Sequence, residues 1–114
     1  MKRKNPERDI QRAIVQHLRA RQRPEVLWFH VHNQPRNAIH GSLLKSLGSM
    51  AGVSDILLFT AKEKFALELK APGGRPTVEQ LEFQDWWRSL NGHAVVAEGL
   101  DEALACLKLW GLLR

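Results

Sequence analysis

The stretch GVSDILLFTAKEKFALELKAPGG, residues 52–74, determines the predicted fold. It contains two apolar runs, residues 55–60 and 63–71, which are too close together for any connection except a hairpin. Side chains alternate between the two faces of a strand, so the second run has one apolar face and one mixed face. The apolar face is Phe65, Leu67 and Leu69, and the mixed face is Ala66, Glu68 and Lys70.

The mixed face carries two charged groups, Glu68 and Lys70, inside an otherwise apolar strand. Charges that lose water need close partners, and an ion pair between these two is the simplest account. Asp55 begins the neighbouring strand and would bring a second carboxylate beside Glu68. Two carboxylates about 4 Å apart repel by roughly 4 kcal/mol at an effective dielectric of 20. Such a pair calls for a hard divalent cation such as Mg²⁺, which suits phosphate substrates. The alternative for Asp55 is a turn residue after Gly52.

The rest of the chain predicts helices around this hairpin. Asn5 and Pro6 are typical of a helix start, and Pro24 closes a helix that runs to about Arg21. VLWFHVHN, residues 26–33, indicates a strand. Residues 35–53 form a long connection in which SLLKSLGSM, residues 42–50, would make a short helix.

After the hairpin, TVEQLEFQDWWRSL (77–90) indicates a helix, HAVVAE (93–98) a strand and DEALACLKLWGLL (101–113) a last helix. The order α-β-β-β-α-β-α predicts an α/β fold, in which a mixed sheet is flanked by helices.

Length and composition predict one domain over residues 1–114, with residues 1–5 flexible, because 114 residues at 44% hydrophobic suit a single core. No apolar run approaches the ~20 residues of a membrane span, and MKRKNPERD lacks the apolar segment of a signal peptide. We therefore expect a cytoplasmic protein, in a bacterium or a phage-infected host. The single cysteine, Cys106, excludes an intrachain disulfide or a cysteine-rich zinc site.

The charge balance favours a nucleic-acid partner. Seventeen Lys and Arg against twelve Asp and Glu give a net charge of +5, and phosphates release counterions to such a surface. A basic tail such as MKRK is equally typical of solvated chain, so charge alone does not decide. His30 and His32 share one strand face and suit phosphate contact or simply a half-buried face of the strand, or alternatively a metal pair. The sequence has no Walker A loop or dinucleotide fingerprint, so no nucleotide cofactor is expected.

Over nearly its whole length the chain resembles the VRR-NUC (virus-type replication-repair nuclease) domain of the PD-(D/E)xK nuclease superfamily. GVSD at 52–55 is similar to the Gly-Val-Pro-Asp of that family, and ELK at 68–70 to its catalytic triplet. GGRPTVEQ at 73–80 is similar to the loop and helix start that carry its glutamine, here Gln80. Ser54 stands where proline is usual. The resemblance implies a restriction-endonuclease-like fold.

The family also has a glutamate on its first helix, and Glu7 stands at the matching position. At 100° per residue Glu7 falls within the apolar stripe of that helix, so we expect it to point toward the core. The alternative is a first-turn acid that interacts with the helix dipole. Gln80 likewise has two interpretations: a capping box with Thr77, or a side chain that looks toward the site from the edge of its helix's apolar stripe.

The resemblance implies a metal-dependent DNA endonuclease. Asp55, Glu68 and the backbone carbonyl of Leu69 would hold Mg²⁺ or Mn²⁺, with Glu7 completing the site directly or through water. Lys70 would orient the attacking water or stabilise the transition state, and Gln80 would position Lys70 or the phosphate. Residues implied in or suited to DNA contact are Asn33, Arg36, Lys45 and Arg75.

So small a chain has little room for sequence recognition, so we expect selectivity for branched DNA or Holliday junctions. Stand-alone members of the family resemble resolvases, which implies a homodimer in which two sites face two strands. Two alternatives remain: a catalytically idle nucleic-acid-binding module on the same fold, and a structural protein in which the charges form a salt-bridge network.

Overall fold

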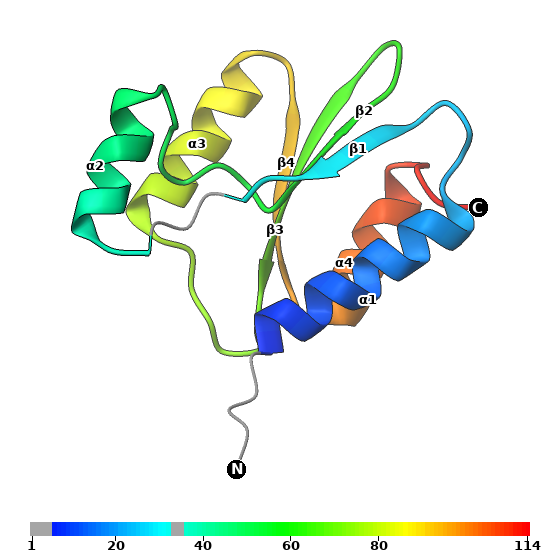
Figure 1. The fold of residues 1–114 in the computed structure, drawn as a ribbon. Helices are drawn as coiled ribbons and strands as arrows, with labels where there is room; N and C mark the ends of the chain where they lie inside the picture. The colour runs from blue at the N-terminus through cyan, green and yellow to red at the C-terminus, as the bar shows by residue number, and fades with distance from the viewer. Residues whose placement is uncertain (1–5, 33–35) are drawn as a thin grey trace.

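The computed structural model describes residues 6–32 and 36–114. Its helices and strands follow the predicted order, with α2 as the short helix expected in the long connection (Figure 1). α2 begins four residues earlier than the expected segment, at Ala38. The elements are α1 (Pro6–Arg21), β1 (Leu27–His30), α2 (Ala38–Ser46), β2 (Ile56–Phe59), β3 (Lys64–Lys70), α3 (Val78–Ser89), β4 (His93–Glu98) and α4 (Leu100–Leu109).

The four strands form one mixed sheet in the order β1-β2-β3-β4. β1 and β2 pair antiparallel, as do β2 and β3, which confirms the hairpin, whereas β3 and β4 pair parallel through the crossover helix α3. In the hairpin Ile56 lies opposite Leu67. If this register is continued by one residue, Asp55 lies opposite Glu68. Paired residues of an antiparallel ladder share one face of the sheet, so these two side chains lie on the same face.

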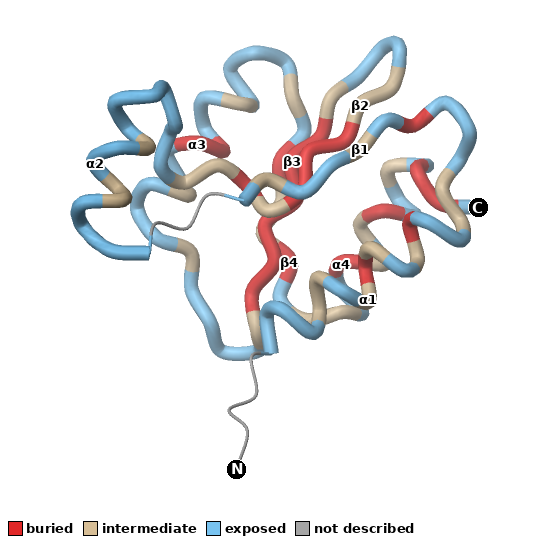
Figure 2. Tube along the Cα trace, in the orientation of Figure 1, coloured by how far each residue is buried: buried red, intermediate tan, exposed pale blue. Residues whose placement is uncertain are grey.

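Helices cover both faces of the sheet. α1 and α4 lie on one face and α3 lies on the other (Figure 1). The predicted apolar face of β3 packs in the larger core with side chains from α1 and α4, whereas Ala66 packs with Phe83 of α3 on the second face. β3 is buried along nearly its whole length (Figure 2). The larger core includes Ile14, Leu18, Phe65, Leu67, Leu69, Ala103 and Leu107, and Cys106 packs against it.

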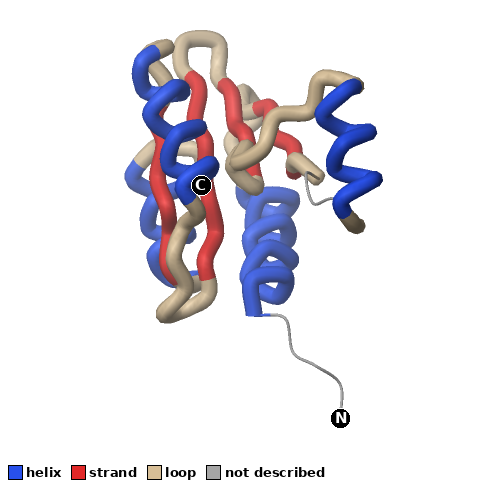
Figure 3. Tube along the Cα trace, turned by 90° about the vertical axis from the view of Figure 1, so that its left-hand side faces the viewer, coloured by secondary structure: helices blue, strands red, loops and turns tan. Residues whose placement is uncertain are grey.

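α2 is the exception to this packing. Every one of its residues is at least partly exposed, and in Figure 3 the helix that follows the short grey trace stands apart from the strands. Ile39 and Leu43 of α2 and its C-cap residue Leu47 recur every four residues and are all exposed, Ile39 to 83%. We call these three residues the α2 stripe.

In the part of the chain that the structure describes, no helix has both the length and the apolar character needed to cross a membrane. The single domain and the cytoplasmic location stay predictions. The cap at Asn5 and the flexibility of residues 1–5 lie outside the described residues.

Candidate active site

Two carboxylates meet at the end of the β2–β3 hairpin. Asp55 immediately precedes β2, and its Oδ2 accepts a hydrogen bond of 2.7 Å from the backbone N–H of Leu69. Glu68 lies one residue earlier in β3 and is only 1% exposed. Among residues 6–32 and 36–114, Glu68 Oε2 has no hydrogen-bond partner. A buried carboxylate oxygen without a partner is costly, so this position suits a positively charged ligand.

The pKa of Glu68 is raised from its ordinary value of 4.5 to about 9. Burial is the largest cause, followed by the charge of Asp55 beside it and a hydrogen bond to the Asp55 carboxyl. Glu7 adds a smaller repulsion, and the positive charge of Lys70 lowers the pKa but does not offset the rest. Glu68 is therefore protonated at neutral pH while no cation is bound.

Lys70 and Glu7 form an ion pair, with 3.7 Å between Lys70 Nζ and Glu7 Oε1. Lys70 is 8% exposed, which is unusual for a lysine. The Glu7 side chain is 49% exposed, so the expectation that it points into the core is wrong. The helical stripe put Glu7 on the correct side of α1, but the first turn of α1 reaches the end of β3 and sets Glu7 against Lys70 instead of against apolar side chains.

Gln80 satisfies both of its interpretations. Its backbone N–H donates to Thr77 Oγ1 at 3.2 Å, and its Oε1 accepts from the Thr77 backbone N–H at 2.8 Å, which completes a capping box. Gln80 also lines the same cleft as Asp55 and Glu68. Because the box uses Oε1, the donor end of the amide, Nε2, is the part of the side chain suited to an anion in that cleft.

Gly52 holds the loop before Asp55 against the start of α3. Its φ is +83°, a conformation that L side chains rarely adopt. A Cβ atom at this position would collide with the backbone of Glu79 and Gln80. The glycine therefore permits the close approach that brings Asp55 and Gln80 to one site. Because both sides of this contact are backbone, no side chain could move aside to make space for a larger residue at position 52.

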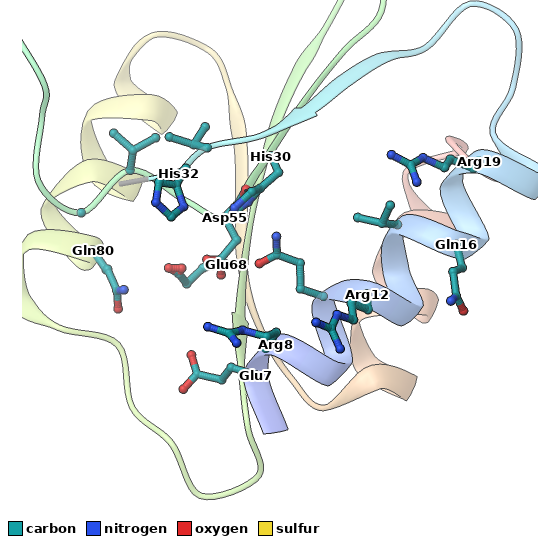
Figure 4. A pocket seen from close by; sticks show the side chains of 15 residues that line it. Glu7, Arg8, Arg12, Gln16, Arg19, His30, His32, Asp55, Glu68 and Gln80 are labelled. Carbon is teal, nitrogen blue, oxygen red and sulfur yellow. The ribbon is translucent and has the colours of Figure 1, made fainter. Parts of the chain in front are cut away.

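These residues line one cleft of about 710 Å³. Figure 4 shows Asp55 and Glu68 in its middle, α1 on one side, the β1 strand above and Gln80 of α3 on the other side. The predicted residues Glu7, Asp55, Glu68 and Gln80 all line it, whereas Lys70 is not among the lining residues and contacts one of them, Glu7, through its ion pair.

α1 forms one wall of the cleft, and its residues there were not among those predicted from the sequence, apart from Glu7. Arg8, Arg12 and Arg19 line the cleft together with glutamines of the same helix. Their spacing of four and seven residues places them on one helical face beside the apolar stripe, and this was the signal available in the sequence. A row of arginines on a helix is usually solvated. Only the position of α1 across the sheet shows that this row faces the cleft that contains Asp55 and Glu68.

Three of the residues expected to contact DNA lie outside the cleft. Arg36, Lys45 and Arg75 are exposed and are not among the residues that line the cleft. Asn33 lies outside the described residues. A role for any of them in DNA contact stays a prediction.

His30 and His32 form the wall opposite α1. Nδ1 of His30 lies 2.9 Å from the backbone carbonyl of Asp55. A carbonyl only accepts, so Nδ1 donates, and Nε2 is left as the other polar atom of the ring. The His32 ring meets His30 edge-on, with 6.3 Å between ring centroids and 72° between planes. Both rings line the cleft.

The donors at the acid pair fit a hard divalent cation. In the described ranges, 6–32 and 36–114, no group of three or more His, Cys, Asp or Glu side chains is placed to hold a metal ion. Mg²⁺ does not require such a cage, because it keeps several waters and is commonly bound through one or two carboxylates. Asp55, Glu68 and the adjacent Leu69 peptide supply that kind of set, and the unpartnered oxygen of Glu68 is a suitable ligand for such an ion.

A solved structure described as a VRR_NUC domain protein has this fold. The two superimpose with a TM-score of 0.76 over 96% of this chain and 90% of that one, at 18% sequence identity. Hjc, a Holliday junction resolvase from Archaeoglobus fulgidus, aligns with a TM-score of 0.45 over 80% of this chain and 64% of its own, also at 18% identity, a likeness too slight to carry an argument. No family model and no curated protein sequence matches the chain. The predicted fold, a mixed sheet flanked by helices like that of the VRR_NUC domain protein, is thus confirmed.

Proposed function

We propose that this protein is a metal-dependent endonuclease that hydrolyses DNA phosphodiester bonds. The observation that carries the proposal is Glu68, a buried carboxylate with a raised pKa and an unpartnered oxygen beside Asp55. A salt-bridge network does not explain this geometry, since Lys70 pairs with Glu7 and its charge does not offset the burial of Glu68 and the repulsion from Asp55. Perturbed acids at the floor of a cleft are typical of catalytic sites.

Asp55, Glu68 and the backbone carbonyl of Leu69 would hold Mg²⁺ or Mn²⁺, and Glu7 would complete the site directly or through water. The bound ion would lower the pKa of a water and neutralise charge on the scissile phosphate. Lys70 then acts as a fixed positive charge, because its ion pair with Glu7 holds the ammonium at the edge of the site. It orients the attacking water or stabilises the charge that develops on the phosphate. Gln80 offers its amide N–H groups to a phosphate oxygen.

Purified protein incubated with labelled four-way junction, flap, duplex and single strand tests the proposal. We expect products with Mg²⁺ or Mn²⁺, none with EDTA, and faster cutting of the branched substrates than of the linear duplex. Cutting that persists in EDTA would remove the metal from the mechanism. Binding without cutting under every condition would favour the idle module, and equal cutting of all four would remove the preference for branched DNA.

We infer that the protein acts as a homodimer through the α2 stripe. α2 has only nine residues, and a helix that short is marginal in water without tertiary packing. The three side chains of the α2 stripe face solvent within one chain. A second copy would present the same stripe, as a two-fold interface requires. Lys45, the charged residue of α2, lies two residues from Leu43 and therefore on the opposite side of the helix, so such an interface would bury no charge from α2.

Sedimentation equilibrium measures this directly. Wild type is expected at twice the chain mass, and Leu43→Glu at the monomer mass, because a buried carboxylate opposes the interface. Leu109→Glu is the matched control: Leu109 is 86% exposed on α4, and the change should leave the dimer intact. A monomeric wild type, or a dimer that survives Leu43→Glu, would contradict the assignment.

A further inference from the structure

The two walls of the cleft differ in chemistry. On α1, Arg12 and Arg19 face the cleft, while Ile14 and Leu18 of the same helix are fully buried in the core. The buried side chains fix the rotation of the helix, so the arginines form a permanent wall. Seven residues separate the two arginines, which is about 10 Å along the helix at 1.5 Å per residue. That span lets the two arginines contact different phosphates of the same strand.

The second wall, which we call the β1 wall, is formed by His30 at the end of β1 and His32 two residues beyond it, and it carries rings instead of cations. His30 is held in place by its hydrogen bond to the Asp55 carbonyl, and His32 packs edge-on against it. Imidazole rings stack on bases whose faces are exposed, which paired bases inside a duplex do not offer. The β1 wall is therefore suited to the base side of a strand and the α1 wall to its phosphate side (Figure 4).

We propose that the cleft holds a single unpaired DNA strand, with its phosphates along Arg12 and Arg19 and its bases against His30 and His32. The proposal rests on the proposed function and names the form of substrate at the cutting point. Two features favour one strand over two. Glu68 is 1% exposed at the floor of the cleft, so the scissile phosphate has to descend between the walls. The volume of about 710 Å³ lies in the range of sites that enclose one small ligand.

This placement gives the expected preference for branched DNA a physical cause. At a flap or junction, one strand leaves its complement and its bases can reach the β1 wall. A continuous duplex would have to unpair locally before its phosphate reached Glu68, and unstacking and unpairing a base costs free energy. The preference then comes from the shape of the cleft and needs no reading of sequence.

Fluorescence anisotropy in EDTA, with a labelled 12-nucleotide single strand at a series of salt concentrations, tests the phosphate wall without cutting. We expect Arg12→Gln/Arg19→Gln to weaken binding and to reduce the slope of log affinity against log salt by about 1.4, since each phosphate contact to a single strand contributes about 0.7. The control Lys62→Gln/Lys108→Gln removes the same net charge from exposed residues that do not line the cleft. The slope of the control should match wild type, and equal slopes for both doubles would overturn the proposal.

His32→Ala tests the base wall. We expect about 10-fold weaker binding of the single strand, an unchanged salt slope, and no effect on a 12-base-pair duplex, because stacking involves no counterion release. Unchanged single-strand binding, or wild-type binding that is tighter for the duplex, would overturn the placement. Thermal melting of each variant checks that the fold is kept.

The outcomes separate this proposal from the proposed function. If wild type cuts DNA but Arg12→Gln/Arg19→Gln keeps the wild-type salt slope, the strand placement fails and the nuclease stands. If wild type never cuts but the arginine and His32 variants lose binding as described, the placement stands and the nuclease fails.

Discussion

Replacing Lys70 with methionine is expected to lower the rate of DNA cleavage by about 10²–10³-fold at saturating DNA, the usual loss when one group that stabilises transition-state charge is removed. Lys70 is 8% exposed and lies 3.7 Å from Glu7, so its charge acts in a poorly solvated position where it is screened little. Methionine keeps a long apolar stem but lacks the charge. Single-turnover cleavage of the best substrate, with enzyme in excess, measures the chemical step without product release.

Lys64→Met is the matched control for this variant. Lys64 lies in the same strand, and its ammonium sits 5.1 Å from the centroid of the Trp87 ring, away from the acid pair. Its cleavage rate should stay within about twofold of wild type, because the cation–π contact contributes to stability rather than to catalysis. Wild-type cleavage by Lys70→Met would remove Lys70 from the mechanism, whereas a loss shared by both variants would indicate a general effect of charge.

The sequence was sufficient for β3 and its two faces because a strand has a strict period of two. Phe65 and Leu69 could only share one face and Glu68 the other, and the tight hairpin then set Asp55 near Glu68. Local rules therefore predicted both the hairpin and the pair of acids.

The parts of the site that come from helices were harder to predict. A helical period gives the direction of a side chain but does not show which other element that side chain faces. For this reason the sequence predicts Glu7 in the core and does not predict that Arg12 and Arg19 line the cleft. Gln80 shows a related difficulty. Its capping box is a local signal, whereas its place in the cleft depends on the contact of α3 with Gly52, which precedes Gln80 by 28 positions along the chain. Such contacts are set by tertiary packing.

Glu68→Gln is expected to stabilise the metal-free protein at pH 8 by roughly 2–4 kcal/mol. Folding raises the pKa of Glu68 from 4.5 to about 9, so the folded state favours the protonated form. This contribution to stability is complete below about pH 4.5 and is lost as the pH rises toward 9. Each pH unit in that window changes stability by up to about 1.4 kcal/mol, and relaxation around the charge reduces the total. Glutamine has no proton to lose, so it escapes this loss.

Urea unfolding in EDTA at several values between pH 5 and pH 9 measures the effect. Wild type should lose stability across this range relative to Glu68→Gln, whose profile should be flatter. Glu82→Gln, a change at an exposed residue of α3, should follow wild type. Parallel profiles for wild type and Glu68→Gln would show that Glu68 is not held protonated by its surroundings.

The same variant links stability to metal binding. A bound Mg²⁺ or Mn²⁺ would compensate the ionised pair of Asp55 and Glu68, so adding either ion at pH 8 should stabilise wild type and leave Glu68→Gln nearly unchanged. Because Glu68 has to lose its proton first, the affinity of wild type for the ion should rise with pH up to about 9. Without metal, Glu68→Gln would then be more stable than wild type, and with metal it would be inactive. This combination is expected of a carboxylate that destabilises the fold but is needed for activity.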